Sequence, residues 1–250
     1  MKIRAVTVDL WGTLFYDPPS SDNRYKRRRL TDFESILAGA GARVPMADLD
    51  RAYEQSAATL GRIWMKNRDV AVEQHVRAIL DAVDARLAAR LGPTTIQALA
   101  RAYAQPALIV PPAVDDGALA AMEALAARGY VLAVVSNTMR TPGATLRKIL
   151  EHYKLLGCFA VLTFSDECGV RKPDPEIFRL TLRAAAVEPG EAVHVGDDAT
   201  LDVEGGHAAG MRVVQVTTAV PRSFGRQKPE AAIPRLAGLP DAIAQLDGRL

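Results

Sequence analysis

The sequence predicts an α/β protein in which a parallel β-sheet, covered by helices on both faces, is interrupted by an all-helical insertion. Two observations lead to this fold class. Short, continuously apolar runs alternate with helical segments over most of the chain, and such strands are typical of a parallel sheet that is buried on both faces. Residues 22–105, in contrast, carry helical periodicity and no strand pattern.

The expected strands of the sheet are apolar runs, at Ile3–Val8, Tyr130–Val135, Ala160–Phe164, Ala192–Val195 and Arg212–Val216. A helix from about Asp116 to Arg128 precedes the second run. It ends at Gly129, where a glycine suits the left-handed backbone that often closes a helix. The first run belongs with the later ones, so the two ends of the chain build one sheet.

The insertion is expected to be helical because of its apolar spacing. Apolar residues recur every three or four positions over Leu49–Trp64 and again over Val72–Leu87, as the buried face of a helix requires. Gly92-Pro93 separates two of these helices, and Pro111-Pro112 indicates a linker after them. We therefore expect an α/β core formed by residues 1–17 and 106–250, and a helical domain formed by residues 18–105.

The composition excludes several classes of function. The chain has 250 residues, 49% of them hydrophobic, which suffices for a core and a smaller domain. A formal net charge of +2 does not predict a nucleic-acid or membrane partner, and no apolar run is long enough to cross a bilayer. Two cysteines in unlike contexts argue against a disulfide framework. No signal peptide is expected, because Arg4 and Asp9 interrupt the apolar region that one would need. The expected location is the reducing cytoplasm; no pattern indicates an oligomeric state.

Polar side chains follow the predicted strands at the point where each strand ends. Open parallel sheets bind their ligands at the carboxyl ends of the strands, so these side chains are expected to share one site. In chain order they are Asp9, Thr13, Ser136, Asn137, Lys172, Asp197, Asp198 and Asp202.

These groups suit phosphoryl transfer. Clustered carboxylates raise one another's pKa, and a hard cation such as Mg²⁺, which prefers oxygen ligands, relieves their repulsion. Ser136 and Lys172 can bind phosphoryl oxygens, which leaves Asp9 to face the phosphorus. The pattern predicts movement of a phosphoryl group onto a carboxylate and then onto water.

Four motifs resemble those of the haloacid dehalogenase-like hydrolase superfamily. They are "DLWGTL", against D-x-D-G-T-L in the family, then "VVSNT", "SDECGVRKPDPEIF" and "HVGDDATLDVEGGHAAGM". They occur in the family's order, span nearly the whole chain, and are specific when the last two occur together. The resemblance implies a Rossmann-like core and a helical cap domain between the first two motifs. It also implies a Mg²⁺-dependent phosphatase that acts on a small phosphorylated metabolite through an aspartyl-phosphate.

The resemblance further implies three kinds of site residue. The catalytic residues are Asp9, Ser136 and Lys172. The residues beside the substrate are Thr13, Asn137 and Trp11. The metal ligands are Asp9, Trp11 through its backbone carbonyl, Asp197, Asp198 and Asp202, and either Asp198 or Asp202 acts through water. Asp198 is equally suited to cap the helix that follows it.

Trp11 departs from the family pattern. The family's phosphatases carry a second aspartate at this position, which protonates the leaving oxygen and then activates water, whereas indole is only a hydrogen-bond donor. Three hypotheses stay open: a Mg²⁺-dependent phosphohydrolase without this acid, a metal-independent 2-haloacid dehalogenase whose halide leaves without a proton, and a non-catalytic ligand-binding protein. Asp197 and Asp198 favour the first, because without a cation they would repel a carboxylate substrate.

A basic run, Arg24–Arg29, begins the insertion. Neighbouring helical residues point about 100° apart, so most of these cations are expected to face solvent. Because the family's cap covers the site, contact of one or two of them with an anionic substrate stays a hypothesis. RNA binding is disfavoured, since only Tyr25 interrupts the run.

Overall fold

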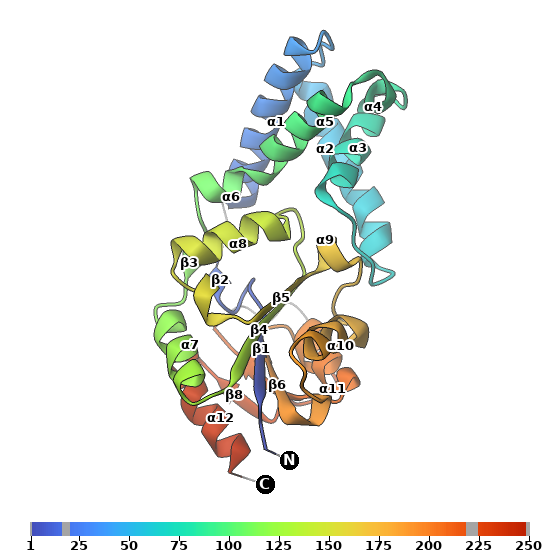
Figure 1. Cartoon of the computed structure of the whole chain (residues 1–250). Coiled ribbons are helices and arrows are strands. Elements are labelled where there is room, and N and C mark those ends of the chain that lie inside the picture. The colour runs from blue at the N-terminus through green and yellow to red at the C-terminus, as the bar shows by residue number, and fades with distance from the viewer. Residues whose placement is uncertain (1, 17–20, 219–224, 249–250) are drawn as a thin grey trace.

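A computed structural model describes residues 2–16, 21–218 and 225–248. Its centre is a six-stranded sheet in the order β5-β4-β1-β6-β7-β8, with all neighbouring strands parallel (Figure 1). The strands are β1 (Ala5–Val8), β4 (Val131–Ser136), β5 (Val161–Phe164), β6 (Ala192–Gly196), β7 (Arg212–Val216) and β8 (Ala231–Ile233). The predicted fold class and all five predicted strands are confirmed, and β8 is an additional edge strand.

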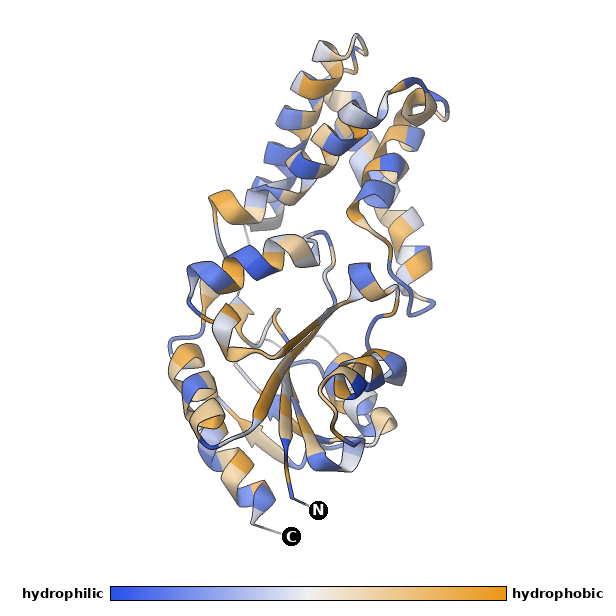
Figure 2. Ribbon diagram, in the orientation of Figure 1, coloured by the Kyte–Doolittle hydropathy of each residue, from blue (hydrophilic) through white to orange (hydrophobic). Residues whose placement is uncertain are grey.

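Helices cover both faces of the sheet, because the strands present apolar side chains on each face and these side chains must be buried. In β1, Val6 and Val8 pack into one buried cluster, whereas Ala5 belongs to the cluster on the other face. The first face is covered by α7 (Ala118–Ala127), α8 (Gly143–His152) and α12 (Leu239–Asp247). The second is covered by α10 (Pro175–Ala184) and α11 (Gly205–Ala209). Figure 2 shows the apolar strands between helices of mixed hydropathy.

The helical insertion consists of α1 to α5 and has a buried cluster of its own, which includes Phe33, Leu49, Ile79 and Leu99. Its helices are α1 (Ser21–Gly39), α2 (Met46–Trp64), α3 (Val72–Val83), α4 (Leu87–Arg90) and α5 (Pro93–Ala104), with α6 (Pro106–Ile109) leading back to the sheet. Figure 1 shows it at the end of the sheet opposite the chain termini. The predicted boundary after residue 17 lies outside the described residues. None of the described helices is long and apolar enough to cross a membrane.

A short two-stranded antiparallel sheet marks the place where the chain leaves the core and returns to it. β2 (Phe15–Tyr16) pairs antiparallel with β3 (Ala113–Val114). The sequence did not predict these strands, because two residues are too few to show a period. The pairing brings the two connections of the insertion side by side.

The basic run of α1 divides between solvent and the interior. Arg24, Arg27 and Arg28 are exposed, as expected. Arg29 is buried, and its guanidinium donates to Tyr53 Oη at 3.0 Å and to the carbonyl oxygens of Tyr103 and Arg140 at 2.8 Å each. Since Arg140 follows β4, Arg29 connects the insertion to the core.

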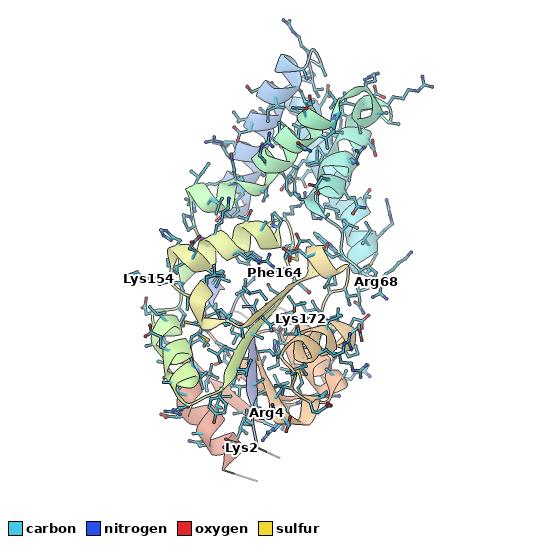
Figure 3. The ribbon with its side chains drawn as sticks, in the orientation of Figure 1. Lys2, Arg4, Arg68, Lys154, Phe164 and Lys172 are labelled. Atoms are coloured by element: carbon cyan, nitrogen blue, oxygen red, sulfur yellow. The ribbon has the colours of Figure 1, made fainter. Side chains whose placement is uncertain are left out.

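A second connection lies between the α2–α3 loop and the loop after the short helix α9 (Ser165–Cys168). Asp69 N donates to Gly169 O at 3.1 Å, and Arg171 N donates to Asn67 O at 3.2 Å. Arg68 also forms an ion pair with Asp174 at 2.9 Å. This two-sided pairing, which we name the junction ladder, joins the insertion to the loop that carries Lys172. Figure 3 shows Arg68 at the end of the insertion nearest the core.

Candidate active site

Three buried carboxylates converge beyond the carboxyl ends of β1 and β6. Asp9 follows β1, Asp197 follows β6, and Asp202 lies in the next turn, η3 (Ala199–Glu204). One carboxylate oxygen from each lies within 4.8 Å of the others. These strands are neighbours at the centre of the sheet, and the chain builds outward from β1 on one side and β6 on the other, which places the cluster where such sheets bind ligands.

Lys172 lies within this acidic cluster and is buried. Its Nζ is 2.8 Å from Asp9 Oδ1 and 2.6 Å from Asp202 Oδ1. Burial opposes the charge of the ammonium, but attraction to Asp202 and Asp9 outweighs burial and raises the pKa of Lys172. In Figure 3, Lys172 lies at the insertion-facing end of the sheet and Arg4 lies at the other end.

The protonation tendencies of the carboxylates differ. Burial raises the pKa of Asp9 from 3.8 to about 7, despite attraction to Lys172, and repulsion by Asp202 and Asp197 adds to the rise. Burial also opposes the charge on Asp202, but Lys172 and His194 overcome it and hold the pKa of Asp202 below its ordinary value. Among the described residues, the ammonium of Lys172 contacts Asp9 and Asp202, and three buried carboxylates so close together are oxygen ligands that suit a divalent cation.

The turn after β6 gives Asp198 and Asp202 different surroundings. η3 is one turn of π-helix, in which Val203 N donates to Asp198 O at 3.1 Å. The side chain of Asp198 accepts from Thr200 N and Leu201 N at 2.8 Å each and so caps this turn. The wide turn directs Asp202 back into the cluster, where its Oδ2 accepts from Asp198 N at 2.9 Å. Asp202, not Asp198, therefore joins Asp9 and Asp197.

The loop after β1 approaches Asp197 closely. Gly12 has φ +88°, and a Cβ placed there would lie 2.3 Å from Asp197 Oδ2. Thr13 Oγ1 lies 3.5 Å from Asp197 Oδ1, at the limit of a hydrogen bond. The glycine thus supplies both a left-handed backbone and the space that the carboxylate fills.

Gly12→Ala is expected to lower the free energy of unfolding in chelator by ~1–3 kcal/mol more than Gly41→Ala does. Gly41 is the matched control, because its φ is +78° and nothing lies within 4 Å of an added Cβ. Both variants carry the backbone strain, but only Gly12→Ala collides with Asp197. Urea denaturation measures the difference, and equal losses would contradict the close packing of Gly12 against the carboxylate.

The loop after β4 holds the lysine loop in place. Asn137 Nδ2 donates to Lys172 O at 3.1 Å, and Lys172 N donates to Asn137 Oδ1 at 2.9 Å. The amide predicted to face the substrate therefore clamps the backbone of the lysine. Ser136 is fully buried, and its hydroxyl has a long contact, 3.5 Å, with Asn137 O.

Trp11 offers the site no acid. Its ring is half-buried and packs edge-on against Phe15, with 6.1 Å between ring centroids. Its Nε1 is buried and has no hydrogen-bond partner among residues 2–16, 21–218 and 225–248. A buried, unpaired N–H is costly, so the hydrogen-bonding requirement of this atom is unmet among the described residues.

Two side chains that the sequence analysis did not select also reach the cluster. Gln215 Nε2 donates to Asp197 O at 3.0 Å, and His194 Nε2 lies 3.0 Å from Asp202 Oδ1. His194 lies inside the otherwise apolar strand β6, and Gln215 lies in β7, which also contains Arg212. A polar residue inside a buried strand was the available signal, since such a group needs a hydrogen-bond partner.

Known proteins with similar sequences point to one family. A family model described as haloacid dehalogenase-like hydrolase matches residues 3–210. The chain is 40% identical over 106 residues to haloacid dehalogenase-like hydrolase domain-containing protein 3 of Mus musculus, covering 42% of this chain and 41% of that protein. That match therefore spans less than half of the mouse protein.

Two further likenesses extend over nearly the whole chain. The phosphoglycolate phosphatase of Rhodospirillum rubrum is 33% identical over 239 residues, covering 95% of this chain and 87% of that protein. The crystal structure of a 2-haloacid dehalogenase from Pseudomonas syringae pv. Tomato DC3000 superposes with a TM-score of 0.71 at 25% identity. That superposition covers 98% of this chain and 99% of the dehalogenase.

Proposed function

Because the chain belongs to the haloacid dehalogenase-like hydrolases, we propose that it is a Mg²⁺-dependent phosphatase of a small phosphorylated metabolite. The observation that supports this most is the buried cluster of Asp9, Asp197 and Asp202, in which the ammonium of Lys172 contacts Asp9 and Asp202. The proposed intermediate is an aspartyl-phosphate on Asp9. In this proposal α1 to α5 form a cap over the site, and residues 1–17 and 106–250 form the catalytic core.

The residues fit the metal that the family implies. Asp9 and Asp197 supply hard oxygen ligands from adjacent strands, and the backbone carbonyl of Trp11 is proposed as a third ligand. When bound, Mg²⁺ would offset the negative charge of the carboxylates and of a phosphoryl oxygen. Asp202 already accepts from Lys172, His194 and Asp198 N, so we assign it to holding the lysine and supporting the metal indirectly.

The chain's own groups then carry the reaction. A carboxylate oxygen of Asp9 forms a bond to phosphorus while the bond from phosphorus to the leaving oxygen breaks. Lys172 has two acceptors in contact among the described residues, Asp9 and Asp202, so its third N–H is available to a phosphoryl oxygen. Ser136 binds another oxygen. Water then attacks the phosphorus of the aspartyl-phosphate, the bond from phosphorus to the Asp9 oxygen breaks, and inorganic phosphate leaves with one proton of the water while the other passes to solvent. Trp11 donates no useful proton, so favoured substrates have leaving groups of low basicity or carry their own acid.

The second candidate function is metal-independent dehalogenation of a 2-haloacid. Two observations favour it: the likeness to the Pseudomonas enzyme over nearly the full chain, and Trp11 in place of an acid. The three carboxylates count against it, because a carboxylate substrate would enter an already negative site. A like-charge pair at ~4 Å costs on the order of 4 kcal/mol at an effective dielectric of 20.

One experiment separates the candidates. Protein freed of metal with chelator is assayed with p-nitrophenyl phosphate while Mg²⁺ is added back, and in parallel with 2-chloropropionate for halide release. Phosphate release that depends on Mg²⁺ supports the phosphatase. Halide release in chelator without phosphatase activity overturns it in favour of the dehalogenase. Saturable Mg²⁺ binding with neither reaction overturns both in favour of a ligand-binding protein.

Trp11→Asp is expected to speed hydrolysis of an alkyl phosphate at least tenfold, with little change for an aryl phosphate. General acid catalysis contributes ~10²–10⁴-fold, and an alkoxide needs the proton more than a phenolate does. Trp11→Asn is the matched control, since it opens the same space without supplying an acid. If both variants lose activity equally on both substrates, Trp11 shapes the substrate pocket, and the missing acid does not limit the rate of hydrolysis.

A further inference from the structure

We propose that His194, held by Thr7, is a positioning residue that fixes the carboxylate of Asp202 and, through it, the ammonium of Lys172. This inference rests on the proposed phosphatase function. His194 and Thr7 do not contact the substrate site themselves, and they lie inside the sheet, in β6 and β1. They form the far end of a buried chain of polar contacts that ends at the nucleophile.

The contacts in this chain are short and continuous. Thr7 Oγ1 lies 2.8 Å from His194 Nδ1, and His194 Nε2 lies 3.0 Å from Asp202 Oδ1. The same Oδ1 accepts from Lys172 Nζ at 2.6 Å, and Nζ lies 2.8 Å from Asp9 Oδ1. Thr7, His194 and Asp202 have no exposed surface. We name these five residues the buried relay.

We infer one arrangement for the hydrogen atoms of the buried relay. A carboxylate in an ion pair only accepts, so His194 must donate from Nε2 to Asp202. A doubly protonated ring would add a second buried cation beside Lys172 on the same oxygen atom, with no further carboxylate in contact among the described residues. The ring is therefore neutral, its Nδ1 is an acceptor, and Thr7 donates to it. Asp202 thereby selects the tautomer, and Thr7 supplies the donor that the unprotonated Nδ1 needs.

This arrangement anchors both oxygens of Asp202. Oδ2 accepts from Asp198 N at 2.9 Å, and Oδ1 accepts from both Lys172 and His194. A carboxylate held at both oxygens cannot rotate, so it fixes the direction of the Lys172 ammonium. The remaining N–H of Lys172 then has a fixed direction before the substrate arrives, as preorganised stabilisation of a transition state requires.

Packing alone does not account for His194. A strand position with no exposure ordinarily favours an apolar residue, because burial of two ring nitrogens is costly unless both are hydrogen-bonded. Both nitrogens are engaged here, one toward the site and one away from it. Phe178 contacts the ring edge-on at 4.8 Å between centroids and limits its rotation. The position is built to hold an imidazole in one orientation.

Three variants test the relay by their kcat and KM on p-nitrophenyl phosphate at saturating Mg²⁺. His194→Leu is expected to lower kcat by ~10–100-fold with KM changed less than threefold, as losses of such supporting partners typically do. His194→Gln, whose amide can still donate to Asp202, should recover most of that loss. Thr7→Val should lower kcat severalfold, because His194 Nδ1 loses its hydrogen-bond partner and the ring is held less firmly against Asp202.

Thr181→Val is the matched control for Thr7→Val. Thr181 is also fully buried, and its hydroxyl bonds to Thr163 Oγ1 and Ile177 O at 2.8 and 2.9 Å, outside the relay. It should cost stability without changing kcat. Wild-type kcat in folded His194→Leu would overturn the proposal. Equal kcat in Thr7→Val and Thr181→Val would also overturn it. If His194→Leu does not fold, the comparison of kcat between Thr7→Val and Thr181→Val tests the proposal instead.

A readout independent of catalysis separates this proposal from the proposed function. In protein labelled with ¹⁵N at its histidines, long-range ¹H–¹⁵N spectra should show His194 as the neutral Nε2–H tautomer at neutral pH. Thr7→Val should keep this tautomer but shift the Nδ1 resonance, because that nitrogen loses its hydrogen bond. That result stands whether or not the wild type hydrolyses phosphates, whereas an Nδ1–H tautomer in the wild type would overturn the relay directly.

Discussion

Asp9→Asn is expected to abolish turnover, with a loss of at least ~10³-fold in kcat, while the fold is kept. The amide is nearly isosteric with the carboxylate but is a poor nucleophile and a poor metal ligand, so the covalent route closes. Phosphate release from p-nitrophenyl phosphate measures the loss, and circular dichroism checks the fold. A clean preparation that retains a tenth of wild-type activity would show that Asp9 is not the nucleophile.

The same variant is expected to change how stability depends on pH in chelator. The pKa of Asp9 is raised from 3.8 to about 7, so the folded protein holds this proton more tightly than the unfolded chain does. Wild-type stability attributable to Asp9 is therefore lost as pH rises through this window. Asn does not titrate, so the melting temperature of Asp9→Asn minus that of the wild type should rise between pH 4 and 7. A difference that is flat in pH would contradict the raised pKa.

Lys172→Met is expected to lower kcat/KM by ~10²–10³-fold, as loss of one donor to a developing negative charge typically does. It should also destabilise the metal-free protein by ~3–5 kcal/mol, because Asp9 and Asp202 keep their burial and lose their cation. Methionine has a similar length without the charge, so packing is largely retained. Kinetics and urea denaturation measure the two effects.

Lys148→Met is the matched control for this substitution, since Lys148 is exposed on α8. It should change neither quantity measurably. Added Mg²⁺ should narrow the stability gap between Lys172→Met and the wild type, because the cation replaces part of the missing charge. Unchanged kinetics in Lys172→Met would remove the lysine from the proposed site.

The sequence predicted the sheet because its central strands are apolar on both faces. It missed β8, which has only three residues, and the two-residue strands β2 and β3, because so short a strand shows no period. The helices of the insertion were recognisable from their spacing. Arg29 was not distinguishable from its exposed neighbours, since its burial depends on Tyr53 and Tyr103, which lie far along the chain.

The candidate site was predictable where a polar residue ends a strand, as at Asp9 and Asp197. The sequence did not predict which of Asp198 and Asp202 joins the cluster. That outcome depends on a π-helical turn, which local residue spacing does not indicate. Asn137 was expected to face the substrate, and its hydrogen bonds to the Lys172 backbone are long-range contacts that only the folded chain reveals. His194 was not predicted because it lies inside β6, whereas the residues selected from the sequence lie at the ends of strands.

The junction ladder makes the contact between the insertion and the core measurable by hydrogen exchange. The amide hydrogens of Asp69 and Arg171 are both held in hydrogen bonds between the insertion and the core, so each exchanges with solvent only when those bonds break. Their exchange rates therefore report how often the contact between the insertion and the core opens at this place. Arg171 adjoins Lys172 in the chain, so the same two amides lie beside the loop that holds the ammonium. Hydrogen exchange at Asp69 and Arg171 thus measures the opening of this contact without any substrate.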